Sequence, residues 1–166
     1  MTPVSRPVAG GHLFSIDGLV DKILGVDDIE GITVSGGEPF CQAGGLVSLI
    51  RRLRTHRDLG VIVYSGYRLK SLRRLAKQNP AVSGLLAQID LLIDGPYIAE
   101  RNDGAPLRGS ANQGVIPLSG RYLPFLSSYG PNQPRNVELH LDIGERMLVG
   151  IPSSRQLAWW NSQKAE

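Results

Sequence analysis

The sequence predicts an α/β fold built on a parallel β-sheet. Three short segments rich in apolar and β-branched residues begin at Gly31, Gly60 and Ile89, about 29 residues apart. Apolar residues at helical spacing separate each pair of segments. This alternation is typical of βαβ units, whose right-handed crossovers bring consecutive strands side by side in parallel.

Capping and breaking residues place the individual elements. A first helix is predicted over 16–24, with Ser15 or Asp17 as its N-cap and Gly25 at its end. Asn79-Pro80 stops a later helix, because the residue before a proline disfavours helical backbone. Apolar periodicity predicts the rest: a strand over 31–35, a helix over 43–56, a strand over 60–64, a helix over 69–76, a helical turn over 82–87 and a strand over 89–94.

The pattern changes after the third predicted strand. Residues 95–114 are polar and rich in glycine, which predicts a long functional loop. Residues 137–141 alternate apolar and polar side chains, and 146–149 follow a turn that contains Gly144, so a β-hairpin is expected near the C-terminus. Beyond it, Trp159-Trp160 is expected either to dock onto the domain or to fray.

Composition places the chain among globular proteins. Its 166 residues are enough for one domain with a real core, and 42% apolar with 20% charged residues is ordinary for a soluble protein. The apolar runs are too short to span a bilayer, so no membrane association is expected, and the N-terminus does not resemble a secretory signal. The single cysteine, Cys41, rules out an intramolecular disulfide and fits a reducing cytoplasm.

A net charge of +3 and a pI near 9.2 are mildly basic. The basic residues fall on the predicted outer faces of two helices, where a solvated surface is the simplest explanation. No aromatic residues are interleaved with them to stack on bases, and no phosphate-binding glycine motif is present. Nucleic acid is therefore not an expected partner.

A carboxylate follows the first predicted strand on a glycine-containing turn. Residues 33–40 read Thr-Val-Ser-Gly-Gly-Glu-Pro-Phe. Gly36 and Gly37 let the backbone turn sharply and approach a ligand closely, and Pro39 favours an extended Glu38. A carboxylate in this position suits a positively charged group such as an amine. The alternative is an ordinary strand-to-helix loop with a solvated glutamate.

All three predicted strands end in polar sequence. Glu38 follows the first strand, Ser65 the second, and Asp94 ends the third. Ligands of parallel α/β folds bind at the carboxyl ends of the strands, so we expect these side chains around one crevice.

Together, these segments resemble the radical S-adenosylmethionine (radical SAM) superfamily and, within it, the anaerobic ribonucleotide reductase activating proteins. The resemblance covers about residues 11–118, and the hairpin region is similar to longer single-cluster relatives. It is carried by Gly-Gly-Glu-Pro at 36–39, Ile-Val-Tyr-Ser-Gly-Tyr at 62–67, Leu-Ile-Asp-Gly-Pro-Tyr-Ile at 92–98 and Leu-Arg-Gly-Ser-Ala-Asn-Gln at 107–113, where Ala111 replaces the second serine of the family's Arg-Gly-Ser-Ser-Asn-Gln.

The resemblance implies a partial (β/α) barrel of the radical SAM type. Residues 1–166 would form one domain, with a core over about 11–118 and a C-terminal extension over about 119–166 that contains the hairpin. It also implies reductive cleavage of S-adenosylmethionine by a [4Fe–4S] cluster to a 5′-deoxyadenosyl radical. That radical would activate a glycyl-radical enzyme such as anaerobic ribonucleotide reductase. The implied cofactor-binding residues are Gly36, Gly37, Glu38, Pro39, Ser65, Asp94 and Asn112, of which the first three would hold the methionine amino group.

The chain departs from the family in its cysteines. Members carry Cys-x₃-Cys-x₂-Cys upstream of Gly-Gly-Glu-Pro, whereas the one cysteine here is Cys41, which is more simply a small thiol at a helix start. Residues 8–15 resemble the segment just after the third cluster cysteine, so the first βα unit is expected to be missing. Either the reading frame starts earlier, which the intact Glu38 turn favours, or the protein is a cluster-free relative that binds nucleotides or proteins.

Overall fold

A four-stranded sheet forms the centre of the protein. The computed structural model describes residues 13–128, 137–142, 145–150 and 152–163. The first three strands are parallel to their neighbours, and the fourth is antiparallel to the third. The strand order is β1 (Gly31–Val34), β2 (Gly60–Ser65), β3 (Leu91–Asp94) and β4 (Gly114–Pro117).

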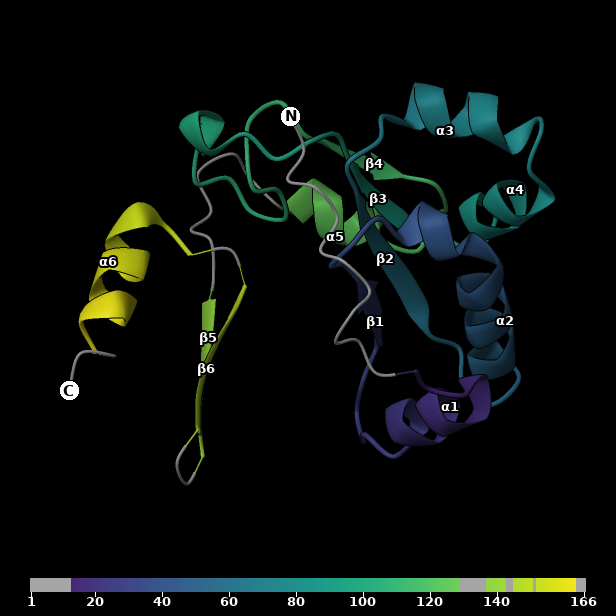
Figure 1. Cartoon of the computed structure of the whole chain (residues 1–166), viewed down its shortest axis with the longest axis horizontal. Coiled ribbons are helices and arrows are strands. Elements are labelled where there is room, and N and C mark those ends of the chain that lie inside the picture. Colours follow the sequence, from purple (N-terminus) through teal and green to yellow (C-terminus); the bar gives the residue numbers. More distant parts are fainter. Residues whose placement is uncertain (1–12, 129–136, 143–144, 151, 164–166) are drawn as a thin grey trace.

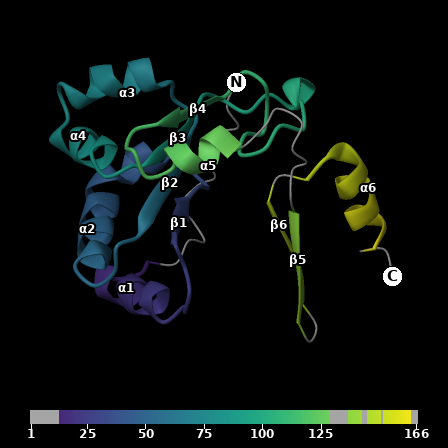
Figure 2. The same ribbon diagram turned by 180° about the vertical axis from the view of Figure 1, so that it is seen from behind.

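Helices cover both faces of this sheet. Four lie on one face (Figure 1): α1 (Ile16–Leu24), α2 (Ala43–Arg54), α3 (Leu69–Ala76) and α4 (Pro80–Leu86). The fifth, α5 (Leu123–Ser128), crosses the other face (Figure 2). Two 3₁₀ turns, η1 (Pro39–Gln42) and η2 (Ala99–Arg101), follow β1 and β3. None of the described helices has the length and apolarity needed to cross a membrane.

The alternation of side chains along the strands divides the core. Val61, Val63 and Leu92 point to the face covered by α2, α3 and α4, where they join Ile50, Leu72 and Leu85 in the main apolar cluster. Leu91 and Ile93 point to the opposite face and pack with Tyr122. β3 is buried on both faces, which is why its residues form a continuous apolar run.

The predicted α/β class and parallel sheet are confirmed. Helix α1 has the predicted bounds, and the Ser15 Oγ accepts a hydrogen bond from the backbone N–H of Gly18 at 3.0 Å. The predicted strands agree with the observed ones to within two residues at their ends. Closure into a partial barrel and a missing first βα unit remain predictions.

Two core elements differ from the sequence prediction. The predicted turn over 82–87 is a full helix, α4, because Asn79 caps it by accepting from the N–H groups of Ala81 and Val82. The same Asn-Pro pair thus ends α3 and begins α4. The end of the predicted loop over 95–114 leads into β4, which was not predicted and returns the chain along the edge of β3.

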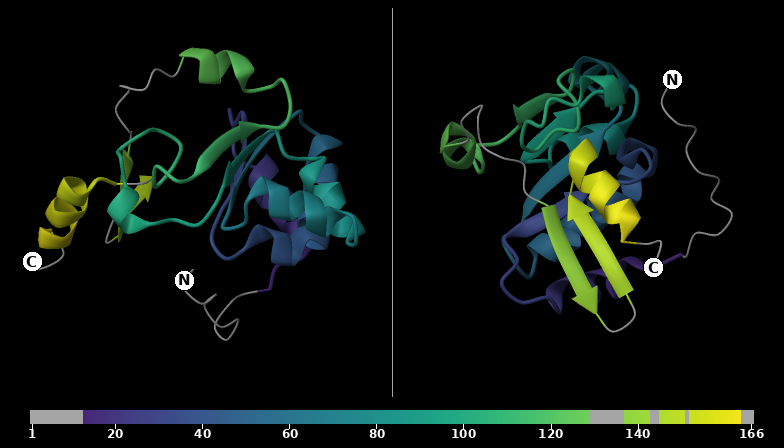
Figure 3. Two further views of the ribbon diagram at one scale, coloured as in Figure 1. Left: turned by 90° about the horizontal axis from the view of Figure 1, so that it is seen from above. Right: turned by 90° about the vertical axis from the view of Figure 1, so that its left-hand side faces the viewer.

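The C-terminal extension contains the expected hairpin, formed by β5 (Val137–Asp142) and β6 (Glu145–Gly150). Gly144, which was expected in its turn, lies outside the described residues. Helix α6 (Ser154–Ser162) begins with a capping box between Ser153 and Gln156 and lies beside the hairpin, apart from α1–α4 (Figures 1 and 3). Both tryptophans lie in this helix rather than in a frayed end, with Trp160 buried and Trp159 half exposed. Docking onto the rest of the domain stays a prediction.

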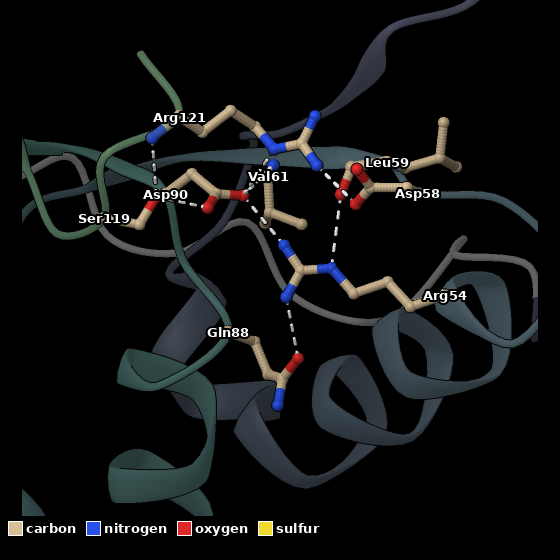
Figure 4. Close-up of polar contacts among 8 residues, drawn as sticks. All are labelled: Arg54, Asp58, Leu59, Val61, Gln88, Asp90, Ser119 and Arg121. Carbon is tan, nitrogen blue, oxygen red and sulfur yellow. Dashed lines mark hydrogen bonds and ion pairs between the residues drawn. The ribbon is translucent and has the colours of Figure 1, made fainter. Parts of the chain in front are cut away.

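A buried carboxylate ties the amino ends of β2 and β3 to their surroundings (Figure 4). Asp90 Oδ2 accepts hydrogen bonds from Arg54 Nη2 at 2.8 Å and from the Val61 N–H at 2.9 Å, and its other oxygen accepts from the Ser119 hydroxyl. Arg54 also donates to the Leu59 carbonyl oxygen and to Gln88. The carboxylate therefore connects α2, β2 and the segment after β4 at the end of the sheet opposite Glu38.

We predict that Asp90→Ala lowers the free energy of unfolding by about 3–5 kcal/mol, because it leaves a partly buried guanidinium and a buried N–H without their acceptor. Asp58→Ala is the matched control. Asp58 pairs with Arg121 in the same network, but its side chain is 83% exposed, so its loss should cost less than about 1 kcal/mol. Urea denaturation measures both values, and equal losses would contradict the assignment.

Candidate functional site

Glu38 lies on the turn between β1 and η1. Gly36 has a φ of +111°, in the region that glycine adopts readily, so the turn requires glycine there. Glu38 itself is extended, with φ −83° and ψ 112°, as the following proline favours, and Pro39 opens the 3₁₀ turn. The local sequence therefore fixes both the direction of the turn and the backbone of the glutamate.

The carboxylate of Glu38 joins the carboxyl ends of β1 and β2. Its Oε1 accepts hydrogen bonds from the Phe40 N–H at 3.1 Å and from Ser65 Oγ at 2.9 Å. Its Oε2 accepts from the Gly66 N–H at 3.0 Å. A carboxylate has about four acceptor positions, so three of them are used and capacity remains on Oε2. The side chain is held in one place and can still accept a further donor.

The described residues leave the glycine turn beside this carboxylate uncovered. Gly36 and Gly37 are exposed, and a Cβ added at either position would meet no atom within 4 Å. Within the described part of the chain, no residue donates a hydrogen bond to either carbonyl oxygen. The turn therefore leaves open space and two acceptor carbonyls next to Glu38.

Ser65 links Glu38 to the loop after β2. The residue is 4% exposed, and its hydroxyl donates to Glu38 while accepting from the Tyr67 N–H at 3.0 Å. Its backbone carbonyl oxygen accepts from the Gly95 N–H at 3.0 Å. Ser65 thus orients the glutamate, and its own hydroxyl is occupied on both sides.

Asp94 lies at the neighbouring strand end but makes different contacts. It pairs with Ser65 in the β2–β3 register and is 4% exposed. Oδ2 accepts from the Leu69 N–H at 2.7 Å, and Oδ1 accepts from the Gly114 N–H at 3.2 Å and from Arg68 Nη1 at 3.3 Å. Its carboxylate therefore fixes the starts of α3 and β4 and holds a guanidinium at the edge of the sheet.

Asn112 and Gln113 hold the segment before β4 against the end of β3. Gln113 Oε1 accepts from the N–H groups of Gly109 and Ser110, and its Nε2 donates to the Gly95 carbonyl oxygen at 2.9 Å. Asn112 Nδ2 donates to the Pro96 carbonyl oxygen at 2.7 Å, whereas its Oδ1 is buried without a partner among the described residues. These contacts hold the loop against the end of β3, and the cofactor-binding role implied for Asn112 stays a prediction.

Sequence reasoning missed one residue of this region. It counted Arg68 among the solvated residues of a helix face, but the guanidinium lies over Gly95 and contacts Asp94. The available signal was its position, because Arg68 follows the end of β2 by three residues and α3 begins immediately after it.

The residues of this chain do not fit a [4Fe–4S] cluster. Such a cluster with one open iron needs three thiolates, and the sequence contains one cysteine, which is exposed. In the described ranges, no three His, Cys, Asp or Glu side chains are grouped to hold a metal ion. His140 contacts Glu138 on the hairpin, and His12 lies outside the described residues.

Comparisons with known proteins match the part of the chain that contains these motifs. Residues 5–116 match the family described as "4Fe-4S single cluster domain". An anaerobic ribonucleoside-triphosphate reductase-activating protein of Vibrio cholerae is 36% identical over 115 residues, covering 64% of this chain and 70% of the relative. A protein of the same name from Haemophilus influenzae is 38% identical over 88 residues, covering 51% and 53%.

No solved structure matches significantly. The family match spans most of the chain, and the Vibrio cholerae relative is covered over more than two thirds of its length. The chain therefore belongs to the 4Fe-4S single cluster domain family and is a homologue of the anaerobic ribonucleoside-triphosphate reductase-activating proteins, which are radical SAM activases.

Proposed function

We propose that the crevice at the carboxyl ends of β1, β2 and β3 binds S-adenosylmethionine through its methionine amino group. The chain would then act in activating a glycyl-radical enzyme such as anaerobic ribonucleotide reductase. The observation that carries the proposal is the Glu38 carboxylate, which Ser65 and Gly66 hold beside an uncovered glycine turn. The names of the two relatives support the choice of partner.

The chemistry of an ammonium group fits the acceptors of this turn. An ammonium has three N–H donors and no acceptor, and a carboxylate makes short, charge-assisted hydrogen bonds with it. Glu38 Oε2 retains acceptor capacity, and the carbonyl oxygens of Gly36 and Gly37 are unused within the described residues. These three acceptors would satisfy the group, while Ser65 keeps the carboxylate from rotating away.

The residues of this chain are assigned binding and orientation only. Cleavage of S-adenosylmethionine to a 5′-deoxyadenosyl radical requires an electron from a [4Fe–4S] cluster, for which the 166 residues do not supply the thiolates. Ser65 positions Glu38, Asp94 positions the start of α3, and Gln113 holds the loop after β3 against the sheet. Proximity and orientation are the catalytic contributions that these contacts support.

The single cysteine favours a second function, in which the chain is a cluster-free module that binds S-adenosylmethionine or a partner protein. The two functions differ in what happens to iron. For the chain as given, we predict that anaerobic incubation with iron and sulfide produces no iron–sulfur absorbance, because one thiolate cannot hold a cluster. A stable [4Fe–4S] spectrum from this chain would contradict both the ligand assignment and the cluster-free alternative.

We predict that Glu38→Gln weakens binding of S-adenosylmethionine by about 1.5–3 kcal/mol, the usual value of a hydrogen bond to a charged group. Titration calorimetry measures the change. The amide –NH₂ would also face the Gly66 or Phe40 N–H, so stability should fall by about 1 kcal/mol. Binding is therefore compared well below the unfolding temperature of each protein.

The matched control for this substitution is Glu30→Gln. It makes the same change in net charge at the amino end of β1, whereas Glu38 follows its carboxyl end. Binding by the Glu30 variant should equal that of the wild type. Unchanged affinity in Glu38→Gln, or an equal loss in both variants, would overturn the assignment of Glu38.

We predict that Gly37→Ala reduces affinity for S-adenosylmethionine while leaving stability within about 0.5 kcal/mol of the wild type. The residue does not have a positive φ, and the added methyl group would meet no atom of the described residues, so any loss of affinity comes from the space it takes from a ligand. Gly36→Ala should reduce stability as well, by about 1–2 kcal/mol, because of its positive φ. Calorimetry and thermal unfolding separate the two effects, and full affinity in Gly37→Ala would place the ligand elsewhere.

A further inference from the structure

We propose that the outer face of α3 is a docking surface for an acidic helix of the protein that this chain activates. The inference rests on the proposed function for the identity of that protein, and it adds the chemistry by which the protein is recognised. Four exposed cations of α3 and its C-cap have the spacing i, i+3, i+4 and i+7, which places them on one helix face. These residues, the α3 stripe, are Lys70, Arg73, Arg74 and Lys77.

The chain supplies no counter-charge for the α3 stripe. No acidic residue occurs between Asp58 and Asp90 in the sequence, a segment that includes all of α3. None of the four cations has an ion pair among the described residues. The basic residues of α2 differ, because Arg52 pairs with Asp17 at 3.5 Å. Arg54 likewise pairs with Asp90 at 2.8 Å. Cations of α2 are therefore partly neutralised within the chain, whereas those of α3 are not.

The α3 stripe destabilises its own helix when nothing is bound to it. Like charges at i, i+3 and i, i+4 repel one another on a helix, and each cation of the stripe has two such neighbours. The helix dipole favours Arg73 and Arg74 in the last turn, but it disfavours Lys70 in the first turn. A bound acidic segment would relieve both effects. Breaking a local rule without a compensating contact is typical of functional surfaces.

The spacing of the α3 stripe suits a helix better than an extended segment. A helix lying beside α3 has the same rise of about 1.5 Å per residue, so acidic side chains at the same spacing stay in register with the cations. An extended segment presents alternate side chains about 6.6 Å apart, whereas one helical turn is about 5.4 Å, so the register is lost. Helix α3 contains no aromatic residue that could stack on bases, which disfavours single-stranded nucleic acid.

The α3 stripe begins beside the proposed binding crevice. Helix α3 follows β2 through the loop whose Gly66 N–H donates to Glu38, and Lys70 is in the first turn of the helix. Helix α4 packs against both α2 and α3, so α3 lies at one end of the helices that cover this face of the sheet (Figure 1). A helix docked on α3 would therefore hold the partner protein next to the crevice.

The alternative is a solvated basic face, which would bind acidic peptides by net charge and would not distinguish the arrangement of that charge. We would compare two alanine-based helical peptides of about 18 residues, each with four glutamates. The one-face peptide has them at i, i+3, i+4 and i+7, and the dispersed peptide has them spread around the helix, with equal helicity checked by circular dichroism. Fluorescence anisotropy at low salt measures both affinities.

The proteins compared are the wild type, the α3 double variant Arg73→Gln/Arg74→Gln and the α2 double variant Arg51→Gln/Arg52→Gln. The α2 variant is the matched control, because both variants replace two adjacent exposed arginines and change the net charge equally. The wild type and the α2 variant are expected to bind the one-face peptide about fivefold more tightly than the dispersed peptide, as two additional surface ion pairs would give. The α3 variant should bind both peptides equally. The preference is a ratio within one protein, so a general loss of stability cancels from it.

Three outcomes would overturn the docking role of α3. The wild type could show no binding or no preference, or both double variants could keep the same preference. The third outcome is micromolar binding of oligothymidylate at physiological salt that the α3 variant alone loses, which would assign the surface to nucleic acid. The expected peptide preference should also shrink as salt is added, because exposed ion pairs are screened.

Titration with S-adenosylmethionine separates this inference from the function on which it rests. Both double variants should bind S-adenosylmethionine as the wild type does, and Glu38→Gln should leave the peptide preference unchanged. If the wild type distinguishes the peptides but does not bind S-adenosylmethionine, the proposed function is wrong and the acidic-helix surface stands without it. If binding of S-adenosylmethionine depends on Glu38 but the peptides are not distinguished, the role of α3 is wrong and the proposed function stands.

Discussion

The arrangement of the strand ends around the glycine turn depends on the hydrogen bonds of one carboxylate. Glu38 comes from the turn after β1, yet its three partners include Ser65 and Gly66 at the end of β2. These bonds hold a glycine-containing turn, which has little conformational preference of its own, against the tip of a neighbouring strand. The open side of the turn and the remaining capacity of Oε2 both follow from this attachment.

Acidic side chains at the two ends of the sheet have different roles. At the amino end, Asp90 is surrounded by donors from α2, β2 and the segment after β4, and its contacts are structural. At the carboxyl end, Asp94 has a similar set of donors, but one of them is the half-exposed Arg68. Glu38 is the least enclosed of the three. The three carboxylates therefore differ in exposure: Asp90 and Asp94 are buried and hold neighbouring elements, whereas Glu38 is the most accessible to a ligand.

The sequence predicted the parts that local rules determine. Strand spacing predicted the parallel sheet, Ser15 predicted the start of α1, and the Gly-Gly-Glu-Pro run predicted a glycine turn followed by an extended Glu38. β4 was missed because four residues with an isolated proline form a strand only where β3 offers an unpaired edge, which is a tertiary condition. Arg68 was missed for a similar reason: its position over Gly95 depends on Asp94, 26 residues away in the chain. Periodicity places a side chain on a helix face, but it does not identify the charge opposite it.

The order of strands also bears on how this protein could be assembled with other polypeptides. Strand β1 is at the end of the sheet, and no described strand pairs with its outer side. An extended segment of another polypeptide can pair with the free N–H and C=O groups of an edge strand and so add a strand to the sheet. Because β1 has only four residues, such an addition would form few main-chain bonds. A segment that paired with this edge would therefore be short and would bind in one orientation. Its binding would be readily reversible unless side-chain contacts beyond the strand contributed.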